Sequence, residues 1–307
     1  MTSGSAIAVD SPEPAGTDPL PATPPAKPRA RFRARGRKRR NTGVLFASGW
    51  IALIVLAAVF ADFLPLAEPD AIGSQTSMRP FTSLQHLLGT DILGRDLLSR
   101  SIFGARVSLA VALGATTLAV VIGGTLGIVA GYVRGWTETG FEIVMNSILA
   151  FPPLIFLIAI VAALQPGIGT LVLGLALVAV PSFARIARAT TLSLTSKEFV
   201  LAAKTLGASP WRIMARELLP NVVIPVLSFA LVMAATLVVA EGSLSFLGLG
   251  IPPPAPSWGG MIAEAQYKLA DHPHLVLVPA VFFFLTVFSL NKLGDWATAK
   301  IGKESAL

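Results

Sequence analysis

The sequence predicts an all-α membrane protein with six transmembrane helices, on three observations. Hydrophobic residues make up 53% of the 307 residues, charged residues only 13%, and the mean hydropathy is +0.71. Six apolar segments of about 19 to 26 residues follow one another, each long enough to cross a hydrocarbon core of about 30 Å as a helix. Because lipid offers no hydrogen bonds to the backbone, segments that meet lipid should be helical.

The predicted spans are the apolar runs between stretches that carry charge, proline or glycine. They cover residues 44–64, 107–132, 141–164, 168–186, 222–247 and 275–293. The first is too long for the apolar region of a cleaved signal peptide, so we interpret it as a retained anchor. An outer loop (65–106) then leads to a five-helix core (107–296), and a short tail (297–307) follows.

Residues 1–43 are predicted to form a disordered, basic tail. The first 28 residues are rich in Pro, Ala, Ser and Thr without apolar periodicity. Nine of the 24 Lys and Arg residues lie between Lys27 and Arg40. Such a block is also found in nucleic-acid-binding proteins. Beside an apolar span, the stronger interpretation is a topology signal that contacts anionic lipid headgroups, with no nucleic-acid partner.

The distribution of basic residues predicts that both termini are cytoplasmic. With the N-terminus inside, 19 Lys and Arg residues lie on the inner side and five on the outer side. Four arginines of the outer loop run against this excess of basic residues on the inner side, and nearby aspartates offset their charge. These arginines are Arg79, Arg95, Arg100 and Arg106.

Glycine and proline predict two features of the helices. Gly123, Gly127 and Gly131 share one face of the second span, which is typical of a seam where another helix approaches closely. Pro152 and Pro153 remove two backbone donors from the third span, so that span should be kinked or broken.

A polar island at residues 195–220 separates the fourth and fifth spans. Residues 198–206 favour a helix, and Gly207 is suited to end it as a C-terminal cap. Ser209 is suited to cap a second helix, with Pro210 at its first position. Such a helix–turn–helix would expose backbone in lipid, so it must lie in cytoplasmic water or against a protein.

The spacing of this island resembles the Glu-Ala-Ala loop of ABC-importer permeases, which docks an ATPase. Gly207 stands thirteen residues before Pro220, with Ala202 and Ala203 just ahead of it. The position of the family's usual glutamate holds Leu201 instead, and the acid here is Glu198. The resemblance implies a coupling surface made by Glu198, Ala202, Ala203, Gly207, Ala208, Ser209, Pro210, Arg212 and Pro220.

Two further stretches resemble signatures of the C-type subunit of peptide/nickel ABC importers. They are GTDILGRDLLSR (89–100), with the residues that follow it, and EGSLSFLGLGIPPPAPSWG (241–259). Together with the segment NKLGD (291–295), the resemblance covers about residues 84 to 296. It implies a type I ABC-importer permease fold in a bacterial inner membrane. It also implies a second permease subunit, two ATPase subunits or one two-domain ATPase, and an extracytoplasmic binding protein.

The function that we expect is a non-enzymatic permease subunit of a peptide importer. The chain has no phosphate-binding Gly-x-x-x-x-Gly-Lys-Ser/Thr motif, so ATP and Mg²⁺ should be bound by partner subunits, with no cofactor in this chain. Nickel or another small solute is an alternative cargo. A self-sufficient secondary transporter is the alternative class, although no internal repeat is visible. An intramembrane enzyme has little support, because there is no Cys and the three His residues lie outside the spans.

Two clusters are candidate sites beyond the coupling surface. Asp91, Arg95 and Asp96 have helical spacing, so we expect Asp91 and Arg95 to pair as an exposed ion pair that shapes a docking surface for the binding protein. Glu241 is expected near the outer end of the fifth span, beside the small residues Ser243 and Ser245. We expect these three to face the translocation path, where a carboxylate can meet the amino terminus of a peptide.

Overall fold

The computed structural model describes residues 42–304, so almost all of the predicted basic tail (1–43) lies outside the described residues. The described part is almost entirely helical and belongs to one compact unit. Its elements are α1 (Thr42–Val59), η1 (Ala61–Phe63), α2 (Leu97–Val133), α3 (Trp136–Ala150), α4 (Pro153–Leu164), α5 (Ile168–Leu194), α6 (Glu198–Thr205), α7 (Pro210–Ile213), η2 (Met214–Leu218), α8 (Leu219–Phe246), α9 (Trp258–Ala265), η3 (Gln266–Lys268) and α10 (His274–Glu304).

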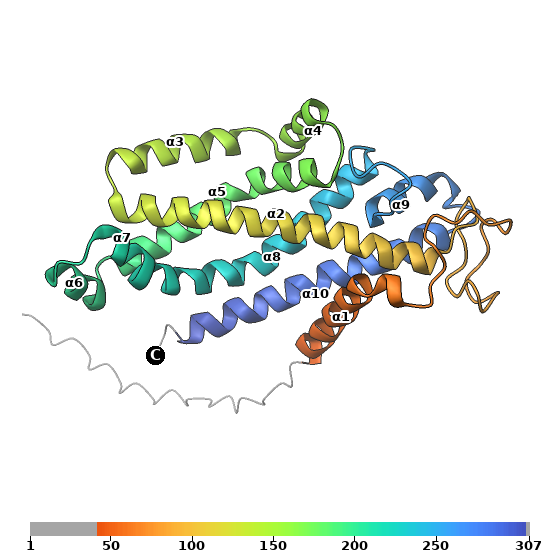
Figure 1. Cartoon of the computed structure of the whole chain (residues 1–307), viewed down its shortest axis with the longest axis horizontal. Helices are drawn as coiled ribbons and strands as arrows, with labels where there is room; N and C mark the ends of the chain where they lie inside the picture. Colours follow the sequence, from red (N-terminus) through yellow and green to blue (C-terminus); the bar gives the residue numbers. More distant parts are fainter. Residues whose placement is uncertain (1–41, 305–307) are drawn as a thin grey trace, which may run out of the picture. The chain divides into compact units, whose positions relative to one another are not determined.

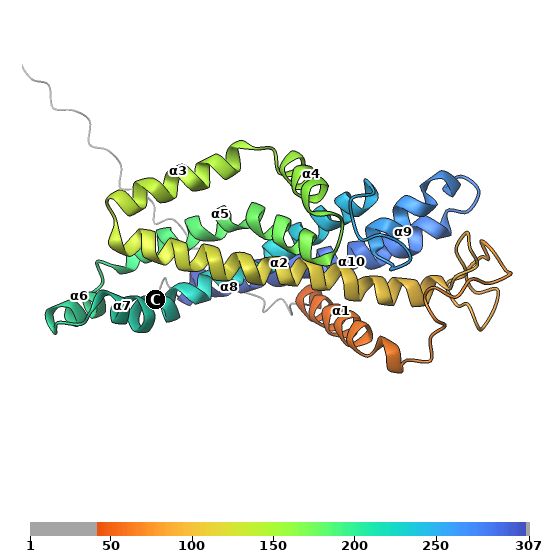
Figure 2. The same cartoon turned by 45° about the horizontal axis from the view of Figure 1, so that its top comes forward.

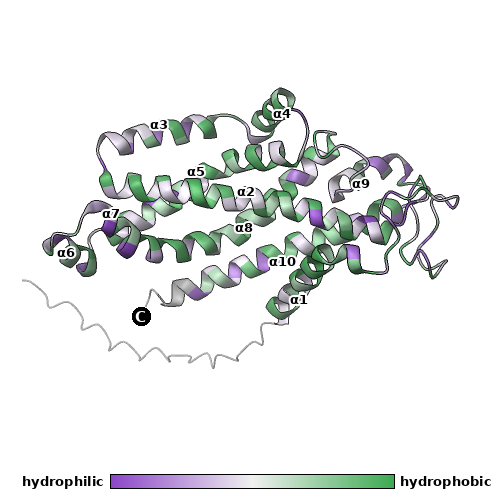
Figure 3. Ribbon diagram, in the orientation of Figure 1, coloured by the Kyte–Doolittle hydropathy of each residue, from purple (hydrophilic) through white to green (hydrophobic). Residues whose placement is uncertain are grey.

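The prediction of a helical membrane protein is confirmed. Within residues 42–304, five helices are long and apolar enough to cross a membrane, and a sixth span is formed if the bent pair α3 and α4 counts as one. Apolar residues run along these helices, as the green ribbons of Figure 3 show. Polar residues gather at the α6–α7 connection and in the loop between η1 and α2, which lie at opposite ends of the bundle in Figures 1 and 2.

Several helices extend past the boundaries of the predicted spans. Helix α2 begins at Leu97, ten residues before the predicted start, because Asp96 caps it by accepting a hydrogen bond from the Ser99 backbone N–H. Helix α8 continues from α7 and η2 as one 37-residue segment, Pro210–Phe246. Helix α10 runs to Glu304, so most of the tail predicted at residues 297–307 continues this helix.

The predicted glycine seam joins α2 to α5, and this is the most extensive helix pair of the bundle. A Cβ atom added at Gly123 would lie 2.7 Å from the Val180 carbonyl oxygen of α5. One added at Gly127 would collide with the Ala184 carbonyl oxygen. The backbones are therefore in direct contact, and this contact requires glycine.

The proline pair breaks the third predicted span. Helices α3 and α4 meet at an angle of 88°, with Pro152 and Pro153 at the break. Helix α3 buries only Met145, yet polar contacts tie it to α5. Arg188 pairs with Glu138 and, at 3.0 Å, with Glu142. These two acids thus neutralise a cation of the neighbouring helix.

Candidate functional site: an exposed elbow and a buried ion-pair network

The α6–α7 connection forms the predicted elbow. Helix α6 ends at Thr205, and Gly207 follows with φ +74°, the left-handed region that glycine adopts at least cost. The Ala208 N–H donates to the Ala203 carbonyl at 3.0 Å and closes the helix end. The predicted C-terminal cap is therefore confirmed.

The second half of the elbow also matches the expectation from the sequence. Ser209 is the N-cap of α7, and its Oγ accepts a hydrogen bond from the Arg212 N–H at 3.4 Å. Pro210 occupies the first turn, where its missing N–H has no cost. A π-helical turn, Met214–Leu218, then leads into α8, and Pro220 lies in the first turn of that helix.

Apolar side chains at the tip of the elbow point to a contact surface. Leu206 is 87% exposed and Trp211 is 73% exposed, while Val200 and Ile213 anchor the elbow in the core. Among the predicted coupling residues, Glu198 and Ala202 are exposed and Ala203 is half-buried. A cavity of ≈ 230 Å³ opens beside Gly207 and Arg212. The sequence analysis did not single out Leu206 and Trp211. Their position as large apolar residues beside the turn of a polar island could have indicated a contact surface.

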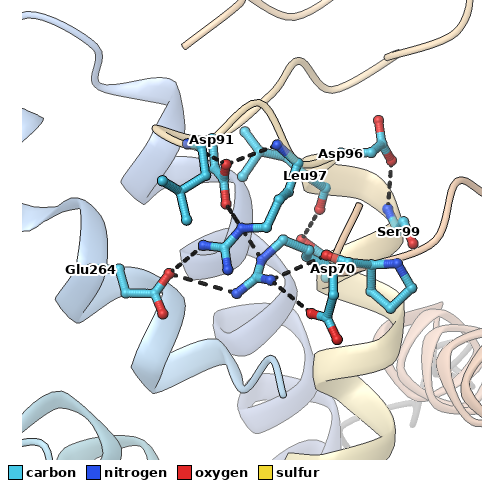
Figure 4. Close-up of polar contacts among 11 residues, drawn as sticks. Asp70, Asp91, Asp96, Leu97, Ser99 and Glu264 are labelled. Atoms are coloured by element: carbon cyan, nitrogen blue, oxygen red, sulfur yellow. Dashed lines mark hydrogen bonds and ion pairs between the residues drawn. The ribbon is translucent and has the colours of Figure 1, made fainter. Parts of the chain in front are cut away.

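At the other end of the bundle, the buried Asp91 and Arg95 and the half-buried Glu264 form an ion-pair network (Figure 4). The Arg95 Nε atom donates to Asp91 Oδ2 at 2.5 Å, and its Nη2 atom donates to Glu264 Oε2 at 2.8 Å. The Arg95 side chain is only 6% exposed. The network thus joins the η1–α2 loop to α9, two segments 169 residues apart in the chain.

Arg100 of α2 is the second cation of this network, and its side chain is 1% exposed. It donates to the Pro69 carbonyl at 3.1 Å and to Asp70 at 3.4 Å. Its guanidinium also lies 3.6 Å from Asp91 and 3.6 Å from Glu264. Both guanidinium groups approach the Oε2 atom of Glu264, whose side chain is labelled in Figure 4. Buried cations need such partners, because desolvation costs several kcal/mol per ion.

Two expectations about this cluster are corrected. Asp91 and Arg95 do pair, but in a turn rather than a helix, since Asp91 Oδ1 accepts the N–H groups of Leu93 and Arg95. The pair is also buried rather than exposed, so it cannot itself be a contact surface. Asp96 caps α2 and contacts His86 Nδ1 at 3.0 Å. Sequence reasoning missed Glu264, because no local signal connects it to Arg95.

Glu241 is also placed differently from the expectation. Its side chain is fully buried within the subunit, so it does not line an open path in this structure. Ser245 Oγ donates to Glu241 Oε1 at 2.7 Å, one helical turn away. Ser108 Oγ of α2 lies beside this carboxylate, but neither it nor Glu241 Oε2 makes a hydrogen bond of good geometry among the described residues. Close packing of α2 and α9 against α8 explains the burial.

Ser243 and Ser245 lie on different faces of α8. Ser243 lines an open, mostly apolar groove of ≈ 380 Å³ with Phe246 and Phe283. Ser245 lines a second cavity at the α8–α9 connection. The structure therefore does not gather Glu241, Ser243 and Ser245 into one path-facing cluster. Among the described residues, no three His, Asp or Glu side chains group as a metal site.

The family match and the similar proteins all indicate a membrane component of a transport system. Residues 123–303 match the family described as "Binding-protein-dependent transport system inner membrane component". The chain is 35% identical over 259 residues to the glutathione transport system permease protein GsiD of Escherichia coli O157:H7, covering 84% of this chain and 86% of that protein. It is 35% identical over 253 residues to GsiD of Pectobacterium atrosepticum, covering 82% and 84%.

The fold is shared with a solved structure of a membrane transporter. A chain of the MetNI methionine ABC transporter, in inward facing conformations, superposes with a TM-score of 0.54 at 20% identity. The match covers 67% of this chain and 96% of that chain. The predicted type I permease fold is thereby confirmed, and the curated relatives are permease proteins of transport systems rather than enzymes.

Proposed function

The chain belongs to the binding-protein-dependent transport system inner membrane components, and from this premise we propose that it forms half of the translocation pathway of an ATP-driven peptide importer. The exposed elbow at Gly207 is the observation that carries the proposal. A bundle that only conducted solute would have no need for a rigid, capped helix–turn–helix that displays Leu206 and Trp211 to water.

In this proposal the elbow inserts into a partner ATPase, which binds ATP and Mg²⁺. Moving a two-state pathway from about 1:99 to 99:1 takes roughly 5.5 kcal/mol of differential binding, and nucleotide-driven closure of the partner is a suitable source. The elbow transmits this movement because α7, η2 and α8 form one continuous 37-residue segment. The π-helical turn at Met214–Leu218 gives that segment a place to bend.

The orientation follows from the same elbow. If it meets a cytoplasmic ATPase, then the opposite end of the bundle faces outward, with the η1–α2 loop and α9. Both termini are then cytoplasmic, in agreement with the excess of basic residues on that side. The outer loop is the natural docking site for an extracytoplasmic binding protein. Asp91, Arg95 and Asp96 support docking by holding the loop in shape.

A short peptide is the cargo that we propose. The support is the 35% identity to permeases named for glutathione, itself a tripeptide. Nickel is disfavoured as a cargo that this subunit ligates, because the described residues include no metal-ligating group of three.

Affinity purification of the tagged full chain from its native membranes tests the assembly. The expected result is co-purification of a second permease and of an ATPase whose activity is present in the eluate. Purification of the chain alone, in a fully active transport system, contradicts the proposal. Cargo is tested by uptake of dipeptides, tripeptides, glutathione and Ni²⁺ in a strain that lacks this gene. Loss of Ni²⁺ uptake alone would refute the peptide assignment.

A further inference from the structure

A cavity of ≈ 250 Å³ opens at the α8–α9 connection, beside the ion-pair network. Its lining includes Ser245, Pro252, Ser257, Glu264 and the buried Arg100. The volume exceeds that of several water molecules and accommodates the end of a small organic molecule. In the orientation proposed above, this cavity faces the extracytoplasmic side.

The lining is rich in hydrogen-bond acceptors. The connection reads Gly-Ile-Pro-Pro-Pro-Ala-Pro over residues 250–256, and its four prolines have carbonyl groups but no N–H. Ser245 already donates its proton to Glu241. The donors of Arg100 are turned to Pro69, Asp70, Asp91 and Glu264. A ligand that brings N–H donors suits such a lining.

The network also carries an excess of negative charge. Asp70, Asp91 and Glu264 supply three carboxylates, whereas Arg95 and Arg100 supply two cations. Both arginines approach one oxygen of Glu264, Oε2, and the other oxygen has no partner among the described residues. Glu264 lines the cavity and is 34% exposed, so the free carboxylate oxygen is accessible there.

We propose that this cavity is a binding site for a primary ammonium group, with Glu264 as its counter-ion. The ligand is the protonated amino terminus of a peptide cargo on its way into the membrane path, so the inference rests on the proposed function in peptide import. Carboxylate-bearing ends are disfavoured, because they would bring a like charge beside the accessible Glu264 carboxylate. A metal ion is disfavoured too, since Glu264 belongs to no group of three His, Asp or Glu side chains among the described residues.

The native chain contains no Cys, which allows a direct test of the cavity's charge. The probe pair is 2-aminoethyl methanethiosulfonate, a cation, and 2-sulfonatoethyl methanethiosulfonate, an anion of similar size. They are applied to the full-length Ala255→Cys chain in its assembled complex, since Ala255 lines the cavity. A Thr82→Cys chain, with its thiol on the exposed η1–α2 loop, corrects for the intrinsic reactivity of the two reagents.

The expected ratio of cation to anion labelling rates is about tenfold higher at Ala255→Cys than at Thr82→Cys. Adding Glu264→Gln should remove this preference. Asp70→Asn is the matched control, because it removes a carboxylate from the same Arg100 without changing the lining of the cavity. It should leave most of the preference in place. Equal ratios at the two thiols, or equal effects of the two substitutions, would overturn the proposal.

Protection from labelling tests the ligand. Alanyl-alanine should slow the labelling of Ala255→Cys, and N-acetyl-alanyl-alanine should not. Equal protection by both, or by neither, would overturn the ammonium site. Because labelling requires no transport, this result is separate from the assembly and uptake experiments. A complex that imports peptides normally but shows no cation preference would contradict this inference alone.

Discussion

The two polar ends of this bundle are built on different physical principles. The elbow at Gly207 is exposed, comes from one continuous segment, and is shaped by backbone conformation and capping. The network around Arg95 is mostly buried, joins the η1–α2 loop and the start of α2 to the distant α9, and is shaped by side-chain charge. Damage to the network should therefore cost stability, whereas damage to the elbow should leave the fold intact and impair coupling. Four substitutions test this difference.

Arg95→Ala should have the largest effect on stability. It leaves Asp91 and the α9 carboxylate Glu264 without their closest cation, and breaking a buried pair from one side typically costs 3–5 kcal/mol. The measurement is the free energy of unfolding in mixed micelles. Arg106→Ala is the control, because its pair with Asp62 is exposed. Equal losses of unfolding free energy in the two variants would show that burial does not determine how much the Arg95 ion pairs stabilise the fold.

Gly127→Val should be the next most damaging. Its new side chain collides with the Ala184 carbonyl in the seam between α2 and α5, and α2 runs the length of the bundle in Figure 1. Overpacking of this kind costs about 1–3 kcal/mol. Gly124→Val is the matched control, since nothing lies within 4 Å of its added Cβ atom. If both variants unfold at the same denaturant concentration, the seam is not a close backbone contact.

Gly207→Val should cost about 1–2 kcal/mol of stability through its positive φ, with no added clash because nothing lies within 4 Å of an added Cβ atom. Its effect on transport should be far larger. We expect insertion and folding to persist while uptake falls and ATP hydrolysis is uncoupled or the ATPase is lost. Gly140→Val in α3, which also has open space around its Cβ position, is the control. Normal uptake by well-expressed Gly207→Val would contradict the coupling role.

Asp62→Asn should have the smallest effect. A hydrogen bond from Arg106 holds the pKa of the Asp62 carboxyl below its ordinary value, although desolvation acts in the opposite direction. A carboxyl with a lowered folded-state pKa adds stability above its unfolded pKa of about 3.8, and this is lost as pH falls through the lowered value. The difference in stability between wild type and Asp62→Asn should thus be small near neutral pH and vanish in acid. A stability difference between wild type and Asp62→Asn that grew as the pH fell would contradict this prediction.

The contrast also explains what the sequence predicts and what it leaves open. The elbow was predictable residue by residue, because Gly207, Ser209 and Pro210 act on their own neighbours in the chain. The spans and the glycine seam followed from local composition and spacing. Glu264 was not predictable, because its partners are far away in sequence. The sequence analysis did not predict the burial of Glu241 for a related reason, because that burial depends on packing between α8 and other helices.

Cross-linking from the two ends of the cysteine-free chain tests the central claim most directly. Leu206→Cys places a thiol at the tip of the elbow, and Leu84→Cys places one on the η1–α2 loop, where Leu84 is 93% exposed. With a bifunctional thiol–amine reagent, we predict that Leu206→Cys forms an adduct with an ATP-binding protein, inside membranes that still import peptide. We predict that Leu84→Cys forms none with that protein. An ATPase adduct from Leu84→Cys, or none from Leu206→Cys in active membranes, would contradict the account.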